Sequence, residues 1–416
     1  MNIEDSYKEP TLRIHRARWV APVSSPPIPN GAVATFGGRI IEVGEAGGLS
    51  LRFHGQVIDH GDVILCPGLV NTHSHMELAP LRYRLEPCGS FTGWIRAILS
   101  ARSKIKVDEL EPAVEMAMDE MSSSGIIAIG DTGNTQLALD IASKSRACPI
   151  KGIFFKEVLC QENDPKALVN DWLSFTDMTS SCFKLTISAH APYTVSPEAI
   201  RVIKSISRLK KRPFSIHLAE SMDEVELLDK KDGPLKKLLE ERGRWPLPYH
   251  LPGASPVSYL SSLNVLDRDT ICVHCVHLSD DDIEILAGSG ATACLCPRSN
   301  FFLGVGIAPV ERLVKAGIPI AIGTDSLASN DRLSIFSEMA SLAHIAPGLS
   351  SEAIFKAATY GGAKALGIDE DVGSLSKGKI STFLAVSAEG IKDHEIYDFL
   401  TSGCEGPDMD CYLING

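Results

Sequence analysis

The sequence predicts an α/β protein, a (β/α)8 TIM-like barrel with a small β-sandwich domain built from both chain ends. Short segments that are apolar throughout recur between residues 66 and 345, and segments with helical spacing of apolar residues separate them. Strands of this kind imply a parallel sheet that is buried on both faces. Eight such units over roughly 280 residues suit a closed barrel. The alternative is a doubly wound open sheet, but no Gly-x-Gly-x-x-Gly follows an early strand to favour it.

The predicted elements fall into three blocks. Residues 11–65 contain short strands separated by turns, with a hairpin around residues 37–44. The predicted barrel strands are residues 70–75, 126–130, 150–158, 184–189, 213–218, 270–276, 291–296 and 319–323. The predicted helices include residues 91–103, 108–123, 197–210, 223–242, 280–287, 308–316, 333–346 and 351–366. A second β-rich stretch begins at Gly373, so we expect residues 1–65 and 371–416 to form one small β-domain beside the barrel at 66–370.

Composition and charge narrow the class of protein. The chain has 416 residues, of which 44% are hydrophobic and 22% charged, as in ordinary globular proteins. Its formal charge of −12 argues against nucleic acid or an anionic membrane as a general partner. No apolar run approaches the ~18 residues of a membrane span, and the first residues lack the apolar core of a signal peptide. We therefore expect a cytoplasmic protein that acts on a small molecule.

A His-x-His motif, His73 and His75, ends the first predicted barrel strand. Residues two apart in a strand point to the same side, so both imidazoles can bind one metal ion. The alternative interpretation is two polar residues on a solvated strand edge. The other strands decide between these interpretations.

Polar residues also follow the C-terminal ends of later strands, where the active site of such a barrel lies. These residues are His190, His217, Glu220, His274, His277 and Asp325. His73, His75, His217 and Asp325 would give three nitrogens and one oxygen and leave an open position for water, as in a catalytic metal site. Such an ion lowers the pKa of its water toward ~7. Glu220 is placed to act as general acid/base, and His274 to stabilise developing charge.

Some of these residues have simpler interpretations. His190 and His277 are also consistent with hydrogen bonds that satisfy loops. Cys272 and Cys275 suggest a redox or zinc site, but an odd offset along a strand points the two thiols to opposite faces. Asp131, after the second strand, is best interpreted as a helix cap or a loop residue.

The chain resembles the amidohydrolase superfamily in its aminohydrolase branch of nucleobase and nucleoside deaminases and chlorohydrolases. The motifs that carry the resemblance are residues 67–75, 217–220, 274–278, 296–300 and 323–326. The resemblance implies that His73, His75, His217 and Asp325 bind the metal, that Glu220, His274 and Asp325 handle protons, and that His190 contacts metal or substrate. Dinuclear members carry a lysine where this chain has His190. The resemblance therefore implies one divalent ion, with zinc the first expectation and iron the alternative.

Within this branch, residues 75–78, 91–94 and 255–260 look more like aminodeoxyfutalosine deaminases of menaquinone synthesis than like methylthioadenosine/S-adenosylhomocysteine deaminases. Glu77 in the first segment is a predicted substrate-binding residue. The implied substrate carries a carboxylate far from its adenine, which an arginine binds through paired hydrogen bonds. Arg82, Arg84 and Arg298 are the predicted candidates for that contact.

Other functions remain as alternatives. They are a methylthioadenosine/S-adenosylhomocysteine deaminase, a chlorohydrolase of the same branch, and a non-catalytic relative that serves as a scaffold. The scaffold is disfavoured because every matched position is occupied. On family grounds we also expect a homodimer or a larger homo-oligomer.

Overall fold

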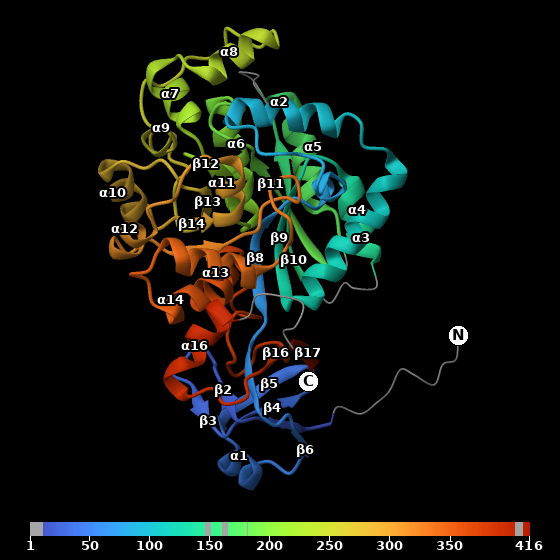
Figure 1. The fold of residues 1–416 in the computed structure, drawn as a ribbon. Coiled ribbons are helices and arrows are strands. Elements are labelled where there is room, and N and C mark those ends of the chain that lie inside the picture. The colour runs from blue at the N-terminus through green and yellow to red at the C-terminus, as the bar shows by residue number, and fades with distance from the viewer. Residues whose placement is uncertain (1–10, 146–150, 160–164, 181, 404–410) are drawn as a thin grey trace, which may run out of the picture.

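The computed structural model describes residues 11–145, 151–159, 165–180, 182–403 and 411–416. Ile150, where a predicted barrel strand begins, lies outside these residues. A large barrel stands above a smaller β-domain (Figure 1). Among the described helices, none has both the length and the apolar character that crossing a bilayer requires.

The barrel strands of the described residues form a closed ring. They are β8 (Leu69–Ser74), β9 (Ile126–Gly133), β10 (Lys151–Val158), β11 (Phe183–Ala189), β12 (Phe214–Leu218), β13 (Thr270–His274), β14 (Thr292–Leu295) and β15 (Ile320–Ile322). Two parallel sheets result, ordered β11-β10-β9-β8 and β12-β13-β14-β15. Across one seam, the His217 N–H donates to the His190 carbonyl at 3.0 Å. Across the other, the Asp325 N–H donates to the His73 carbonyl at 3.1 Å, so the predicted (β/α)8 barrel is confirmed.

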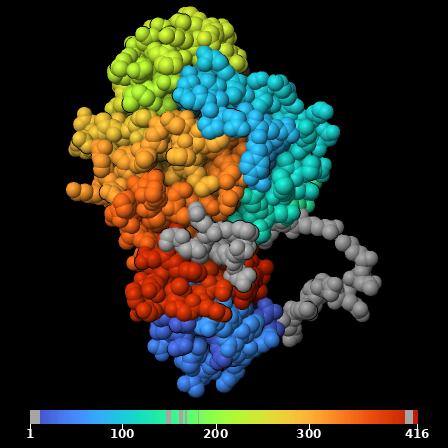
Figure 2. Space-filling model, viewed as in Figure 1, coloured from blue at the N-terminus to red at the C-terminus, as the bar shows by residue number. Residues whose placement is uncertain are grey.

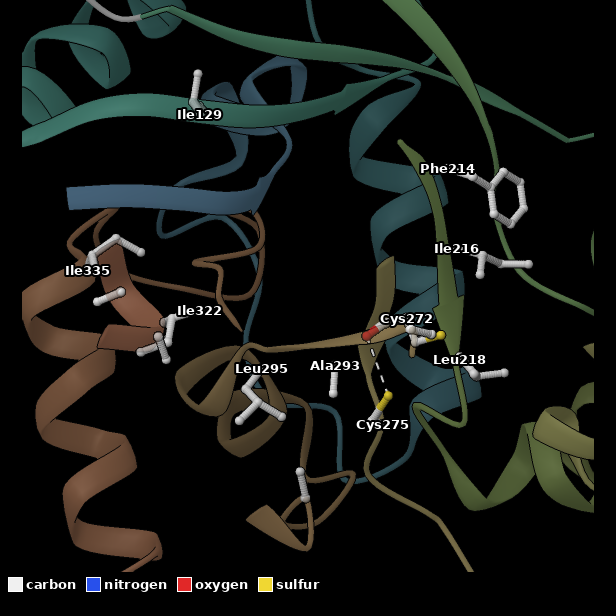
Figure 3. Close-up of a cluster of buried hydrophobic side chains, with 14 of the residues drawn as sticks. Ile129, Phe214, Ile216, Leu218, Cys272, Cys275, Ala293, Leu295, Ile322 and Ile335 are labelled. Carbon is white, nitrogen blue, oxygen red and sulfur yellow. Dashed lines mark hydrogen bonds between the residues drawn. The ribbon is translucent and has the colours of Figure 1, made fainter. Parts of the chain in front are cut away.

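Alternation along the strands separates the barrel interior from the layer beneath the helices. In β13, Ile271 joins the interior cluster, whereas Cys272 packs into the outer layer. In β12, Ile216 and Leu218 pack into that outer layer (Figure 3). Because successive side chains of a strand point to opposite faces, His217 between them faces the inside. The outward apolar residues thus direct a polar residue to the barrel mouth.

Helices surround the barrel and roof its mouth. They are α2 (Phe91–Arg102), α3 (Val107–Ser123), α4 (Gln136–Lys144), α5 (Lys166–Asp177), α6 (Pro197–Lys210), α7 (Met222–Lys230), α8 (Pro234–Glu241), α9 (Pro256–Ser262), α10 (Asp280–Ser289), α11 (Pro297–Leu303), α12 (Val310–Lys315), α13 (Ile335–Ile345), α14 (Ser351–Lys356) and α15 (Gly362–Ala365). Helices α7 and α8 rise above the barrel next to α2 (Figure 1).

The predicted continuous helix over residues 223–242 is wrong. The segment breaks into α7 and α8 because Lys231 adopts a left-handed φ of 58° and Gly233 a φ of 103°, and Pro234 then starts a new helix. This break turns α8 over the mouth. The Arg96 guanidinium on α2 donates to the Glu241 carboxylate at 2.7 Å and links the two helices of the roof.

The small β-domain combines both chain ends. Strands β17 (Cys411–Asn415), β16 (Thr382–Ser387), β7 (Val63–Pro67), β2 (Trp19–Val20) and β3 (Ile28–Pro29) form one sheet in this order. Strands β5 (Arg39–Glu45), β4 (Gly31–Phe36), β1 (Arg13–Arg16) and β6 (Gln56–Asp59) form the second, and α1 (Ala46–Arg52) interrupts this otherwise β-rich region. A shared apolar cluster that includes Val33 and Phe383 joins the sheets. C-terminal residues lie between the N-terminal ones and the barrel (Figure 2).

Candidate active site

Three imidazoles meet at the barrel mouth. His73 is the last residue but one of β8, which ends at Ser74, His75 follows the strand, and His217 lies in β12. One donor atom from each histidine lies within 4.8 Å of the others. The Nε2 atoms of His73 and His75 are 3.1 Å apart. Two nitrogens on a tetrahedral zinc ion would be ~3.3 Å apart at Zn–N distances of ~2.05 Å. The pair is therefore spaced as two ligands of one ion.

Asp325 completes this set from the segment that follows β15, the strand that closes the barrel. Its Oδ1 lies 3.6 Å from Nε2 of His75 and 3.8 Å from Nε2 of His73. Its Oδ2 accepts hydrogen bonds from Ser299 at 2.5 Å and Ser329 at 3.0 Å. Burial opposes ionisation of Asp325, but the imidazoles of His75 and His274 and the Ser299 hydroxyl hold its pKa below the ordinary value. One carboxylate oxygen is thus fixed, and the other faces the histidines.

The protonation of the histidines suits metal binding. The His217 Nδ1–H donates to the His190 carbonyl at 2.8 Å, which leaves Nε2 as the free acceptor. Burial and neighbouring imidazoles lower the pKa of His217 to about 3 and that of His73 well below its ordinary value. Both rings are therefore neutral at physiological pH. The donor set of His73, His75, His217 and Asp325 fits one divalent transition-metal ion.

Glu220 and His274 face each other beside this cluster. The Glu220 Oε1 lies 3.5 Å from the His274 Nε2, and the Nδ1–H of His274 donates to the Asn300 side-chain oxygen at 2.9 Å. Burial raises the pKa of Glu220 to about 8, and the nearby Asp325 carboxylate adds to this rise. A carboxyl group with this pKa carries a proton at neutral pH and can exchange it within the site.

Glu224 fixes the segment that carries Glu220, a role that the sequence did not indicate. The two oxygens of its carboxyl group accept the N–H of Ala219 at 3.1 Å and the N–H of Glu220 at 3.0 Å. Burial raises the pKa of Glu224 itself to about 8. Ala219 has a left-handed φ of 51°, which a residue with a side chain rarely adopts. The carboxyl group of Glu224 therefore holds a strained turn in place.

Strained backbone recurs at this end of the barrel. His274 has a φ of 76°, Cys275 of 52° and Asp325 of 57°. Non-glycine residues with positive φ are uncommon and concentrate at functional sites, where the surrounding structure maintains them. Here they aim the side chains of His274 and Asp325 at the cluster.

A cavity of about 370 Å³ opens onto the cluster. Its inner end includes His75, His190, His217, Glu220, His274 and Asp325. Its outer wall is apolar and comes from α2 and α8, with Phe91, Trp94, Ile95, Ile98, Leu235, Leu238 and Leu239. Arg102, Arg242 and Arg244 also line it. The site therefore combines a polar inner end with an apolar outer part.

The three arginines predicted from sequence lie elsewhere. Arg82 pairs with Glu120, and Arg84 pairs with Glu109 at 3.2 Å. Arg298 pairs with Asp331. None of the three is among the described residues that line the cavity. The sequence placed these three arginines near the barrel mouth. It gave no sign that they form ion pairs with acidic side chains on neighbouring helices and loops.

Glu77 and His190 do line the cavity. The Arg102 guanidinium donates to Glu77 Oε1 at 2.6 Å, and the backbone N–H groups of Asn134 and Thr135 donate to Oε2 at 3.0 Å each. Glu77 thus holds Arg102 at the wall. His190 bonds Thr194 Oγ1 through Nδ1 at 2.8 Å, and its ring centroid lies 5.1 Å from that of His217.

Other candidate residues have structural roles. His277 Nε2–H donates to the Val305 carbonyl at 2.7 Å, which is the loop hydrogen bond of the simpler interpretation. Cys272 and Cys275 are free cysteines, and the Cys275 thiol donates to the Cys272 carbonyl at 3.4 Å (Figure 3). Burial raises the pKa of Cys272 to about 12, so this thiol is unreactive. Asp131 accepts hydrogen bonds from Ser74 Oγ and the Met76 N–H and supports the turn that carries His73 and His75.

Known proteins share this fold. The family model of the amidohydrolase family matches residues 64–404. A 5-methylthioadenosine/S-adenosylhomocysteine deaminase of Thermoanaerobacter pseudethanolicus is 28% identical over 87% of this chain and 82% of its own. The aminofutalosine deaminase of Helicobacter pylori gives a TM-score of 0.83 at 21% identity, covering 93% of this chain and 96% of that one. A zinc-bound adenosine deaminase of Xanthomonas campestris gives 0.77 at 23%, covering 95% and 90%.

The barrel and its mouth define a metal-dependent hydrolase. The family match extends over both the barrel and strands of the small β-domain. The chain belongs to the amidohydrolase family.

Proposed function

We propose that this protein is a zinc-dependent deaminase that hydrolyses the 6-amino group of an adenine nucleoside substituted at its 5′ position. The observation that carries the proposal is the meeting of His73, His75, His217 and Asp325 with Glu220 at the inner end of one cavity. Relatives named as deaminases of methylthioadenosine and S-adenosylhomocysteine support an adenine substrate, and the zinc in a similar fold supports that metal.

The reaction exchanges an amino group for a water oxygen and releases ammonia. When bound, a divalent ion supplies Lewis acidity and a water of lowered pKa. Glu220 holds a proton at neutral pH and delivers it to the purine ring, because its pKa is raised to about 8. Asp325 and His274 accept and orient protons at Oδ1 and Nε2, since the other side-chain atoms of both residues are already hydrogen-bonded. One proton of the water finally leaves with the amine as ammonia, and the other returns to Glu220, which is thereby restored.

The finer proposal is that the substrate is 6-amino-6-deoxyfutalosine, an intermediate of menaquinone synthesis. The apolar outer wall suits an aromatic group beyond the ribose. Arg242 and Arg244 stand at its rim, and neither guanidinium has a hydrogen bond or ion pair among the described residues. A carboxylate on that aromatic group would pair with them.

The helix C-terminus fixes these two arginines. Gly243 follows α8 with a φ of 64°, and the Arg244 N–H donates to the Leu239 carbonyl at 2.8 Å. This is the hydrogen-bond pattern of a glycine-terminated helix. Cations near a helix C-terminus also stabilise the helix, which is the competing explanation for Arg242 and Arg244.

A second candidate is a methylthioadenosine/S-adenosylhomocysteine deaminase, which the sequence relatives favour. Ammonia release from aminodeoxyfutalosine, methylthioadenosine, S-adenosylhomocysteine and adenosine separates the candidates. We expect the highest kcat/KM with aminodeoxyfutalosine. A higher value with methylthioadenosine or S-adenosylhomocysteine would reject the finer proposal and keep the deaminase, whereas no ammonia from any of them would reject both.

The arginine assignment has its own test. Arg242→Ala with Arg244→Ala should raise KM for the carboxylated substrate about 10-fold, because it removes charge-assisted hydrogen bonds. The KM for adenosine should stay constant. The comparison variant is Arg84→Ala, whose guanidinium pairs with Glu109 outside the cavity lining. A rise in KM for Arg84→Ala alone would restore the assignment made from sequence.

A further inference from the structure

A second cavity of about 480 Å³ lies at the opposite end of the barrel, where the strands begin. Its lining includes Ile153 near the start of β10, Lys184 in β11 and Pro213 before β12. We call it the base pocket. Among the described residues, its basic members are Lys184, Arg208, Lys211, Arg212, Arg268 and Lys364, and its one acidic member is Asp269. The base pocket reverses the charge of the whole chain, which has 52 acidic and 40 basic residues.

Most of these cations lack a partner in the part of the chain that the structure describes. Arg208 pairs with Asp267 at 2.9 Å. Lys184, Lys211, Arg268 and Lys364 have neither an ion pair nor a side-chain hydrogen bond to any described residue. The Nε–H of Arg212 is buried and has no acceptor within the same ranges. A buried donor of this kind is costly unless something accepts its hydrogen bond.

The turn from α6 into β12 is held rigidly. Lys211 takes a left-handed φ of 51° where α6 ends. The Arg212 N–H donates to the Ser207 carbonyl at 3.0 Å, and the Ser207 hydroxyl donates back to the Arg212 carbonyl at 2.7 Å. Beneath it, the buried Lys204 ammonium donates to Asp267 at 2.6 Å. Lys211 and Arg212 therefore start from a fixed backbone.

A helix end alone does not account for the base pocket. Cations near the last turn of α6 stabilise that helix, which explains Arg208 and Lys211. Lys184, Arg268 and Lys364 come from β11, the loop before β13, and α15. Positively charged side chains that come together from separate segments repel one another. A bound anion would offset this repulsion.

We propose that the base pocket binds a small anion that carries a chain of phosphate groups. Guanidinium and ammonium groups are the usual phosphate ligands, and several at once favour a multiply charged anion. The volume is within the range of small-molecule sites, and Ile153 and Leu366 add apolar wall. The phosphate chain belongs either to an inorganic polyphosphate or to a nucleotide. This site is separate from the barrel mouth and does not depend on the proposed deaminase activity.

Titration calorimetry of the full-length, metal-loaded protein tests the proposal, with tripolyphosphate, ATP and sulfate as probes at equal ionic strength. We expect tripolyphosphate and ATP to bind, and sulfate to bind at least ~10-fold more weakly because it makes fewer charge-assisted contacts. Equal affinity for tripolyphosphate and ATP means that the phosphate chain alone is recognised, as the proposal states. Tighter binding of ATP means that a nucleotide is the ligand, which also supports it.

A double variant locates the binding site. Arg268→Ala with Lys364→Ala should weaken tripolyphosphate binding at least ~10-fold, since two charged contacts are lost. The matched control is Arg16→Ala with Arg18→Ala, two arginines paired with Asp59 and Asp62 in the small β-domain. Far-UV circular dichroism and the melting temperature check that both variants fold. No binding of either phosphate probe, or unchanged affinity in the Arg268/Lys364 variant, would overturn the proposal.

Discussion

The two ends of the barrel are both polar, but they differ in how their polar groups are held. At the mouth, His73, His217 and His274 are buried and neutral, and the hydrogen bonds of His217 and His274 fix their rings. At the base, cations such as Lys184 and Arg268 are exposed and have no partner in the described part of the chain. Catalysis requires buried side chains with a fixed orientation, whereas exposed charged side chains are suited to binding an ion.

The difference also appears in the backbone. Ala219, His274 and Asp325 have positive φ at the mouth, and Glu224 holds one of these turns. At the base, the left-handed residue Lys211 simply ends a helix. At the mouth, the positive φ values therefore orient side chains toward the site. At the base, the positive φ value lets the chain reverse direction after a helix. Substitutions at the mouth should consequently affect turnover far more than fold.

The largest effect is expected for Asp325→Asn. The change removes the charge at the proposed ligand atom that faces His73 and His75, so both metal content and turnover should fall. We expect the loss of turnover to exceed the ~10²-fold typical of a general acid/base. Elemental analysis and ammonia release measure the two quantities, with Arg16→Ala as the control. Activity at the wild-type level would remove Asp325 from the site.

Glu220→Gln should give the next largest effect. The amide cannot carry or exchange the proton, so kcat should fall at least ~10²-fold. Metal content should change little, because Glu220 lies beside the ligand set and faces His274. The same elemental analysis and a kcat measurement distinguish this variant from Asp325→Asn. If metal and turnover fell together, Glu220 would be a ligand and the division of roles would be wrong.

Glu224→Gln should have a smaller effect on turnover. One of the two N–H groups of Ala219 and Glu220 loses its acceptor, so we expect about a 10-fold lower kcat, less than the ~10² of a 1 Å misplacement. KM should remain near the wild-type value. A larger loss for Glu224→Gln than for Glu220→Gln would contradict a positioning role.

The same variant tests the pKa of Glu224. Its carboxyl group has a pKa of about 8 in the folded protein, above the ~4.3 of an unfolded chain. This group therefore stabilises the fold at low pH, and its contribution disappears as the pH rises through 8. The free energy of unfolding should decline less between pH 5 and pH 8 for Glu224→Gln than for the wild type. Denaturant titrations at several pH values measure this slope, and identical slopes would show that Glu224 is ionised at neutral pH.

The sequence predicted the polar residues at the barrel mouth better than the residues that hold them in position. His217 was foreseen at a strand end because apolar neighbours mark the strand and set its direction. Glu224 was missed because a helical Glu five residues after Ala219 gives no sign that it accepts backbone N–H groups. Arg242 and Arg244 were missed because residues 223–242 were predicted to form one continuous helix. In the structure the chain breaks at Gly233, and this break turns α8 over the mouth.

The base pocket was not foreseen at all. Its basic residues are scattered between Lys184 and Lys364, and only the closing of the barrel brings them together. Spacing along the chain carries no signal for such a site, in contrast to the His-x-His motif at the mouth. Local patterns therefore predicted the site residues that lie in single strands or just after them.

We propose that one divalent ion sits at the barrel mouth between His73, His75, His217 and Asp325. A crystal of the zinc-loaded protein, measured above and below the zinc absorption edge, tests this directly. We predict one strong anomalous peak ~2.0–2.2 Å from a nitrogen of each histidine and an oxygen of Asp325. Full activity in a protein whose crystal shows no such peak, or a peak bound by other residues, would contradict this metal assignment.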